Sequence, residues 1–166
     1  DNTDYITLNN TSATADNAGL WNDTSPTTTV FTIGSIMTSG NYGASHIAYC
    51  FHSVEGYSKA GSFIGNANAN GPFVFTGFRP AWVMIKNIAA STVWDIHDNA
   101  RDIDNPTAAD LFPNAQTAES SGNGIFIDFL SNGFKIRETS TTTNGSGNTH
   151  VYLAFAEQPF KFANAR

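Results

Sequence analysis

The chain has 166 residues and a formal net charge of −6, and only 13% of its residues are charged. Its Lys and Arg residues are few and scattered, which argues against binding to the phosphate backbone of a nucleic acid. No apolar run approaches the roughly 20 residues that a membrane-spanning helix needs, so membrane insertion is not expected either.

The first 29 residues predict one strand followed by a polar arm. YITL at 5–8 alternates between polar and apolar residues, while residues 9–29 are polar and rich in turn formers. The strand has no obvious local partner. Because an extended segment can complete the sheet of another subunit, we predict a donor strand, formed by Tyr5, Ile6, Thr7 and Leu8.

Residues 30–166 predict an all-β domain. Strands are expected at 30–37, 45–54, 72–78, 80–87, 91–98, 124–130, 134–140 and 149–157. The segment NPTAADLF at 105–112 predicts at most one short helix, because Asn105 can cap it and Pro106 suits its first position. The many short strands favour an antiparallel β-sandwich or jelly roll over a parallel α/β sheet.

Two stretches, about 30–57 and 133–162, resemble each other. VFTI and HIAYCF in the first stretch correspond to GFKI and HVYLAF in the second, with His46 matching His150. An internal repeat indicates one supersecondary unit that is used twice. We therefore predict an equivalent core face on both strands, formed by Ile47, Tyr49 and Phe51 in the first copy and by Val151, Leu153 and Phe155 in the second.

Three side chains on the predicted strand 45–54 could bind a metal or supply a thiol. His46, Cys50 and His52 share one face of that strand, and Cys50 is the only cysteine of the chain. The second copy of the repeat has Ala154 and Ala156 in place of Cys50 and His52. We interpret the group as a polar, partly exposed sheet face with one buried thiol.

The segment WDIHDNARDIDNP at 94–106 is acidic enough to suggest a calcium site, with Asp98, Asp102 and Asp104 as the candidate ligands. Calcium prefers several oxygen ligands, yet the segment lacks the glycine and the final glutamate of an EF-hand loop. The alternative is a strand that ends in a capped turn. No metal or other cofactor is expected.

Aromatic residues and Asn triplets on predicted loops suggest two further kinds of site. Side chains that could stack on sugars are Trp21, Tyr42, Tyr57 and Trp94, although aromatic residues more often fill cores. The N-x-S/T triplets that permit glycan attachment begin at Asn9, Asn10, Asn22 and Asn144.

Motifs for enzymatic chemistry are missing from the sequence. It contains no G-x-S-x-G elbow, no phosphate-binding loop and no H-E-x-x-H pair. The glutamates at 55, 119, 138 and 157 are spread along the chain, so no carboxylate pair for glycoside hydrolysis is evident. We therefore expect a protein that is not an enzyme.

Four segments resemble an uncharacterised group of large virion proteins of aquatic bacteriophages. They are VEGYSKAGSFIGN at 54–66, GPFVFTGFRPAWVMIKN at 71–87, FLSNGFKIR at 129–137 and FAEQPFKFANAR at 155–166. The resemblance covers most of residues 30–166. It implies a concanavalin-like or jelly-roll sandwich from a tail, a tail fibre or another structural protein, and it brings no catalytic residues with it.

Two functions from different classes are compatible with the sequence. The first is a structural subunit that assembles with copies of itself into an extracellular or virion filament by strand donation. The alternative is a module of a phage tail fibre that binds a receptor or cell-surface glycans. In both cases we expect the protein outside the cell or on the virion surface.

Overall fold

The computed structural model describes residues 3–38 and 45–158. The chain divides into two compact units, one made of residues 1–7 and 14–50 and the other of residues 8–13 and 51–166. The sequence predicted a polar arm up to residue 29 and a sandwich from residue 30. In the structure, residues 30–50 belong to the first unit, which contains none of the named strands.

The first unit is built from short local elements. Tyr5 and Ala15 form an antiparallel bridge with two backbone hydrogen bonds of 2.9 and 3.1 Å. Helix α1 (Ala18–Trp21) begins after Asn17, whose side chain accepts a hydrogen bond from the Gly19 amide, as expected of an N-cap. Helix α2 (Ser35–Thr38) follows later in the chain.

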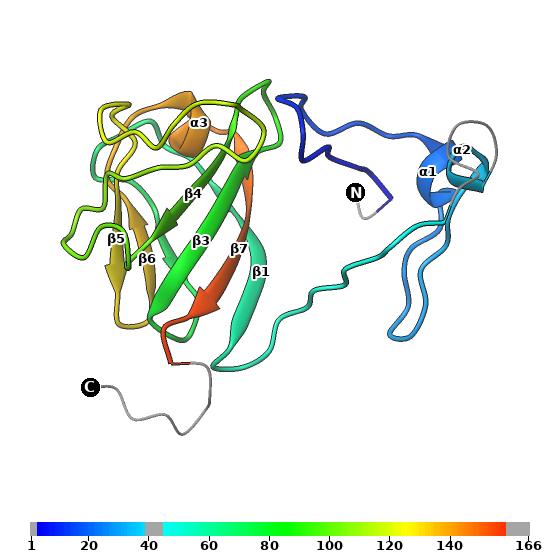
Figure 1. The fold of residues 1–166 in the computed structure, drawn as a ribbon, viewed down its shortest axis with the longest axis horizontal. Helices are drawn as coiled ribbons and strands as arrows, with labels where there is room; N and C mark the ends of the chain where they lie inside the picture. Colours follow the sequence, from blue (N-terminus) through cyan, green and yellow to red (C-terminus); the bar gives the residue numbers. More distant parts are fainter. Residues whose placement is uncertain (1–2, 39–44, 159–166) are drawn as a thin grey trace. The chain divides into compact units, whose positions relative to one another are not determined.

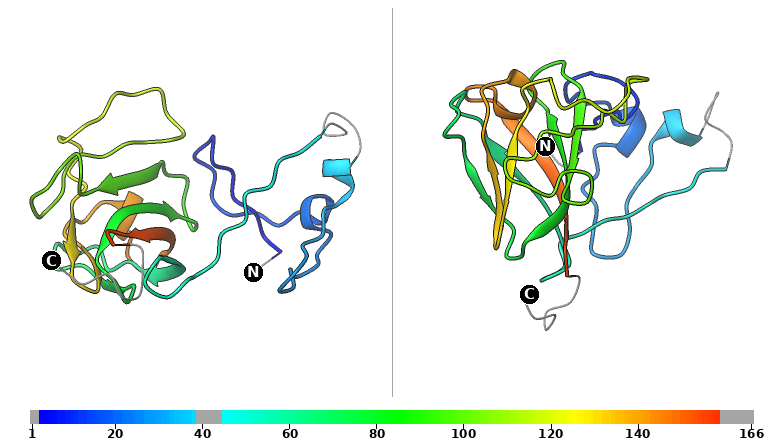
Figure 2. Two further views of the ribbon diagram at one scale, coloured as in Figure 1. Left: turned by 60° about the horizontal axis from the view of Figure 1, so that its bottom comes forward. Right: turned by 60° about the vertical axis from the view of Figure 1, so that its left-hand side comes forward.

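The second unit is an antiparallel β-sandwich, which confirms the predicted all-β class (Figure 1). Its four-stranded sheet has the order β1 (Ser58–Ile64), β7 (Thr149–Ala156), β3 (Pro80–Asn87), β4 (Trp94–Asp98). Its three-stranded sheet has the order β2 (Phe73–Phe75), β6 (Gly133–Ile136), β5 (Ile127–Leu130). The two further views in Figure 2 show the same two layers.

Alternation along the strands places the core between the two sheets. On β3, Val83 and Ile85 are buried while Trp82 and Met84 are only half-buried, as expected when successive side chains point to opposite faces. The rings of Phe134 and Tyr152, from opposite sheets, pack edge to face with their centroids 5.3 Å apart. The core cluster comprises Val74, Phe78, Val83, Ile85, Ile127, Phe129, Phe134, Ile136, Tyr152 and Ala154.

Strand β7 is the central element of the larger sheet. It pairs with β1 from Ser58↔Phe155 to Ile64↔Thr149, and on its other side with β3 from Pro80↔Ala156 to Asn87↔His150. Pro80 stands at the first position of β3, where its missing amide hydrogen is tolerated. The last strand of the chain therefore joins β1 and β3.

The predicted hairpin after residue 130 is confirmed by the pairing of β5 with β6. Leu130 pairs with Gly133, so two residues form the connection. A Cβ atom at Gly133 would lie 2.1 Å from the carbonyl oxygen of Val74 on β2. Only glycine allows β2 to approach β6 so closely at this position.

The predicted helix at 105–112 is wrong, because tertiary hydrogen bonds hold this segment extended. The Asn105 side chain bonds both the amide and the carbonyl of Phe129, each at 2.9 Å. Thr107 then forms a bridge to Ile127 of β5, and Leu111 forms one to Ile96 of β4. The segment thus closes one side of the sandwich by pairing with an edge strand of each sheet.

The predicted strands at 30–37 and 45–54 are wrong too. Residues 30–34 form no strand, and α2 follows them. Residues 45–53 are extended but pair with no strand, and the side chains predicted to face the core are exposed. The first copy of the sequence repeat therefore does not share the strands β6 and β7 of the second.

A third short helix, α3 (Thr141–Asn144), follows β6 and begins at the cap residue Ser140. The described residues contain three helices of four residues each, more than the single short helix predicted from the sequence.

Two phenylalanines on neighbouring strands provide a matched test of the core. Phe134→Ala should lower the free energy of unfolding by about 3–5 kcal/mol, because Phe134 is fully buried between the sheets. Phe75→Ala should change it by less than about 0.5 kcal/mol, because Phe75 is 63% exposed. Urea denaturation of both variants measures the difference. Equal losses would contradict the assigned core.

Candidate assembly surface

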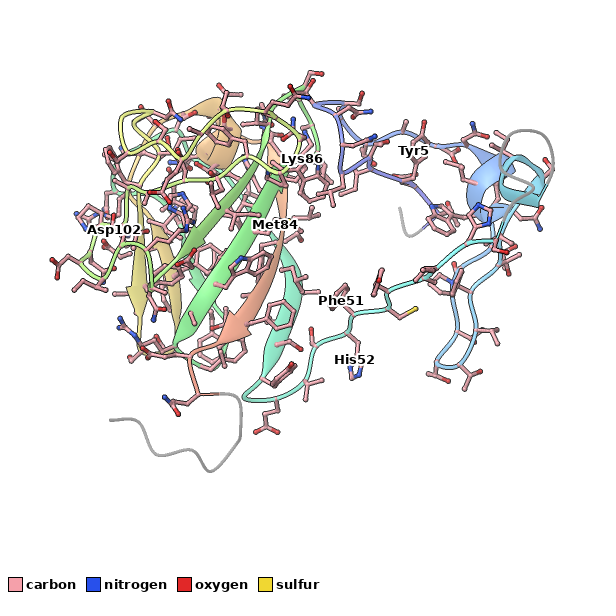
Figure 3. All side chains as sticks on the ribbon, in the orientation of Figure 1. Tyr5, Phe51, His52, Met84, Lys86 and Asp102 are labelled. Atoms are coloured by element: carbon pink, nitrogen blue, oxygen red, sulfur yellow. The ribbon has the colours of Figure 1, made fainter. Side chains whose placement is uncertain are left out.

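The two most exposed large apolar side chains of the described residues, Ile47 and Tyr49, lie on one unpaired segment, residues 45–53. Ile47, Tyr49 and Phe51 are 81%, 80% and 61% exposed. The backbone is extended there, and no strand among the described residues pairs with it (Figure 1). Phe51 and His52 point to opposite sides of the backbone in Figure 3, as in a β-strand. The segment therefore has the side-chain alternation of a strand but lacks a sheet.

Pairing of this segment with its own sheet stops at Ser53. Val54 and Ser58 form an antiparallel bridge around a tight turn, which would allow a longer hairpin. Instead, the Ser53 hydroxyl bonds both the amide and the carbonyl of Ala60, at 3.2 and 3.3 Å. The Ser58 hydroxyl also donates to the His52 carbonyl at 2.9 Å. These side-chain bonds replace the next backbone pair of a hairpin.

No strand among the described residues closes the side of the sandwich opposite residues 105–112, and we call this side open. There, β1 and β2 are the edge strands of their sheets. A pocket of about 410 Å³ lies at this side, and its lining includes Val54, Ser58, Lys59, Phe75 and Thr76. Phe73 and Phe75 on β2 and Ile64 on β1 are exposed as well. An open edge with apolar side chains is a surface on which another strand can add.

The outer face of the four-stranded sheet is apolar. Met84 lies on this face of β3 (Figure 3), and Val151, Leu153 and Phe155 of β7 are half-buried on the same face. Around Phe155 gather the rings of Phe51, Tyr57 and Trp82, with centroids 6.1, 5.9 and 5.6 Å away. This aromatic cluster lies at the C-terminal end of the row of apolar side chains on β7.

A buried lysine fixes residues 8–13 to this sheet. Lys86, labelled in Figure 3, is fully buried, and its ammonium donates to the carbonyls of Thr11 and Thr92 at 3.1 and 2.8 Å. Removal from water lowers the pKa of Lys86 below its ordinary value. The amine therefore links the N-terminal segment to β3.

A polar cluster that the sequence analysis missed lies inside the sandwich. Asp95 and His97 on β4 are fully buried because they share the inward face of the sheet with Ile85 and Val83, with which they pair. The Nε2 atom of His97 lies 2.9 Å from a carboxylate oxygen of Asp95, although the geometry is not that of a hydrogen bond. Its Nδ1 atom lies 3.3 Å from the Thr107 hydroxyl.

This order of hydroxyl, imidazole and carboxylate resembles that of a nucleophilic triad, but no substrate can reach it. Thr107 is buried, and its hydroxyl donates to the carbonyl of Ile127 at 3.1 Å. Nucleophilic catalysis requires a hydroxyl that contacts the substrate. We therefore assign the cluster no catalytic role.

Two further carboxyl groups surround Asp95. Burial, and next the negative charge of Asp95, raise the pKa of Asp110, which is only partly offset by the Asn123 amide. Burial also raises the pKa of Glu138, although the Thr143 hydroxyl and the Ser140 amide bond its oxygens. Both groups favour the protonated form more than they do in water.

The predicted donor strand is partly used within its own unit. The backbone of Tyr5 is bonded to Ala15, and the Thr14 hydroxyl contacts the Tyr5 carbonyl at 3.4 Å. Ile6 and Thr7 are half-buried, whereas Leu8 is exposed. Strand donation by Tyr5–Leu8 stays a prediction.

The candidate metal ligands do not come together. Asp98 accepts hydrogen bonds from Arg101 and the Ala100 amide, Asp102 accepts from the amides of Ala108 and Ala109, and Asp104 is exposed. Among residues 3–38 and 45–158, no three His, Cys, Asp or Glu side chains are placed to share a metal ion. The thiol predicted to be buried, Cys50, is exposed, as are His46 and His52.

The candidate sugar-stacking residues are separated by their burial. Trp94 is buried and unable to stack on a sugar, Trp21 is half-buried, and Tyr57 is exposed but packs edge-on against Phe155. Tyr42 lies outside the described residues.

The candidate glycan sites also differ in exposure. Asn9, Asn10 and Asn22 are exposed. Asn144 is fully buried, and its amide donates to the carbonyls of Asn68 and Glu138, so a glycan cannot be attached there in this fold.

The polar cluster gives a prediction for the pH dependence of stability. Because the pKa of Asp110 is raised in the folded protein, stability falls as the pH rises from the ordinary value of 3.8 through the raised value. Asp110→Asn removes this loss, so the unfolding free energy of the variant relative to wild type should increase from pH 4 to pH 7. Urea denaturation at both pH values measures it. A difference that stays constant would contradict the raised pKa of Asp110.

None of the helices within the described residues has the length and hydropathy to cross a bilayer.

Comparison with known proteins identifies one family. No significant match to a curated protein or to a solved structure was found. A family model described as a domain of unknown function, DUF7483, matches residues 1–159. This match spans nearly the whole chain, and the protein therefore belongs to the DUF7483 family.

Proposed function

We propose that this chain is a non-enzymatic structural subunit whose copies assemble with one another into a filament, either extracellular or part of a virion. The observation that carries the proposal is the unpaired segment 45–53, with Ile47 and Tyr49 almost fully exposed. Isolated exposed apolar side chains are ordinary in proteins. An alternating row of them on an extended backbone is typical of a strand that pairs elsewhere.

The open side of the sandwich supports association between unlike surfaces. Within the described residues, each chain has an unpaired extended segment at 45–53 and a side on which β1 and β2 are edge strands. A contact that joins two different surfaces of identical subunits does not close on itself unless its rotation forms a ring. Repetition of this contact builds a fibre, which is why we favour a filament over a closed dimer.

The interior of the sandwich supports a role without catalysis. Its polar cluster of Asp95, His97 and Thr107 is fully covered, and its polar groups lie between the sheets. The alternative of glycan binding has less support, because Trp94 is buried and Tyr57 is packed against Phe155.

Charged substitutions on the unpaired segment test self-assembly. Ile47→Asp combined with Tyr49→Asp should abolish filaments, because a buried, unpaired carboxylate at a strand contact is strongly unfavourable. Light scattering and negative-stain microscopy measure assembly, and circular dichroism checks the fold. The control, Thr117→Asp with Ala118→Asp, adds the same charge to exposed loop residues and should assemble normally. Filaments of normal length from the first variant would contradict the proposal.

Removal of residues 1–7 tests donation by the N-terminal strand separately. The deletion spares Thr11, which Lys86 binds, so the sandwich should keep its stability. Loss of filaments would assign the contact to the N-terminal strand. Unchanged filaments would contradict N-terminal donation while leaving the role of residues 45–53 intact.

A further inference from the structure

We propose that residues 46–51 of one copy add as a strand to the open edge of β1, at Ser62–Ile64, in a second copy. This inference rests on the proposed self-assembly and names its two contact surfaces. The occupant of the edge is a second copy of this chain, and the donor is a different segment from the N-terminal strand predicted by the sequence.

Alternation along β1 determines which of its backbone amides and carbonyls face away from β7 and are free to pair. The carbonyl of Tyr57 accepts from Ala156 and the amide of Gly65 donates to Asn148, so odd-numbered residues face the β7 side. Even-numbered residues face away from β7: Ser58 bonds Val54, and Ala60 bonds the Ser53 hydroxyl. Ser62 and Ile64 continue this side, so their amides and carbonyls face the open edge.

The donor has a sequence that already pairs with β1. HIAYCF at 46–51 corresponds to HVYLAF at 150–155, which lies in β7, and β7 pairs with β1 over its whole length. In β7, Val151, Leu153 and Phe155 lie on the outer face of the sheet. Ile47 and Tyr49 occupy the same positions in the donor, whereas Phe51 already contacts Phe155 of its own chain. The addition of Ile47 and Tyr49 would extend this apolar face and cover Ile64, which is 56% exposed.

The interruption of the hairpin within the chain favours a donor from another copy. The Ser53 hydroxyl occupies both backbone groups of Ala60, so the hairpin around residues 55–57 ends there. The opposite edge of the larger sheet is unavailable as well, because Leu111 pairs with Ile96 on β4. Among the described residues of the larger sheet, the edge of β1 at Ser62–Ile64 is therefore the one offered to the donor of a neighbour.

Cross-linking between two single-cysteine chains tests the contact. The wild-type chain carries only Cys50, and the variant Cys50→Ser with Ser62→Cys carries its cysteine on the β1 edge. Opposite residues of paired strands lie about 4.5–5.5 Å apart. Cys50 alternates with Tyr49 and therefore projects from the other face of the sheet than the cysteine that replaces Ser62, so a flexible bis-maleimide long enough to pass round the edge strand is used. Mixed filaments of the two chains, distinguished by a size tag, should yield the cross-linked heterodimer. The control, Cys50→Ser with Thr117→Cys, should yield none.

A second experiment tests which chain is the donor and which is the acceptor. Ile47→Asp with Tyr49→Asp placed in the chain that carries Cys50 should abolish the heterodimer. The same pair placed in the chain with the Ser62→Cys edge should leave it, because only the donor of the other chain is used at that edge. Equal effects from both placements would overturn the assignment of donor and acceptor.

The outcomes separate this inference from the proposed function. Filaments without a heterodimer would overturn the contact between residues 46–51 and β1 but leave self-assembly standing. Wild-type protein that stays monomeric at all concentrations would overturn both. A heterodimer that forms with the edge cysteine and not with Thr117→Cys would support both.

Discussion

The placement of β7 between β1 and β3 is the constraint on which the rest of the sandwich depends. It joins the last strand of the chain to two strands that lie far earlier in the sequence. It also delivers Tyr152 and Ala154 to the core. Without β7, strand β1 would have no partner in the sheet, and β3 would lose one of the two strands with which it pairs. Such long-range pairing requires a large loss of chain entropy, which the apolar core offsets.

Strands that carry their own pattern were predictable from the sequence, while segments fixed by distant partners were not. The bounds of β3 were predicted correctly, and the hairpin of β5 and β6 followed from its turn. The segment 105–112 has the local signals of a helix, but Asn105 binds the backbone of Phe129 instead. Residues 45–53 show the converse case, because alternation in a sequence predicts an extended backbone without revealing its partner.

The candidate surface was only partly visible in the sequence for the same reason. The alternation of Ile47, Tyr49 and Phe51 was found, but it predicted a core face where the structure has an exposed one. The polar cluster was missed because Asp95 and His97 resemble the solvent face of a strand. Their pairing with Ile85 and Val83, which no local pattern contains, places them inside. The register of a strand against its neighbour therefore decides which of its alternate side chains face the core and which face solvent.

The closed side of the sandwich has a consequence for any polymer that this chain builds. Thr107 and Leu111 seal both sheets on one side with residues of the same chain, whereas the other side ends in β1 and β2. A fibre made by adding strands to such a module has two chemically different tips. At one tip the β1 edge lacks an added strand, and at the other tip the apolar segment 45–53 lacks a sheet to join. Growth and shortening would then proceed at unequal rates at the two tips, and the fibre would have a polarity.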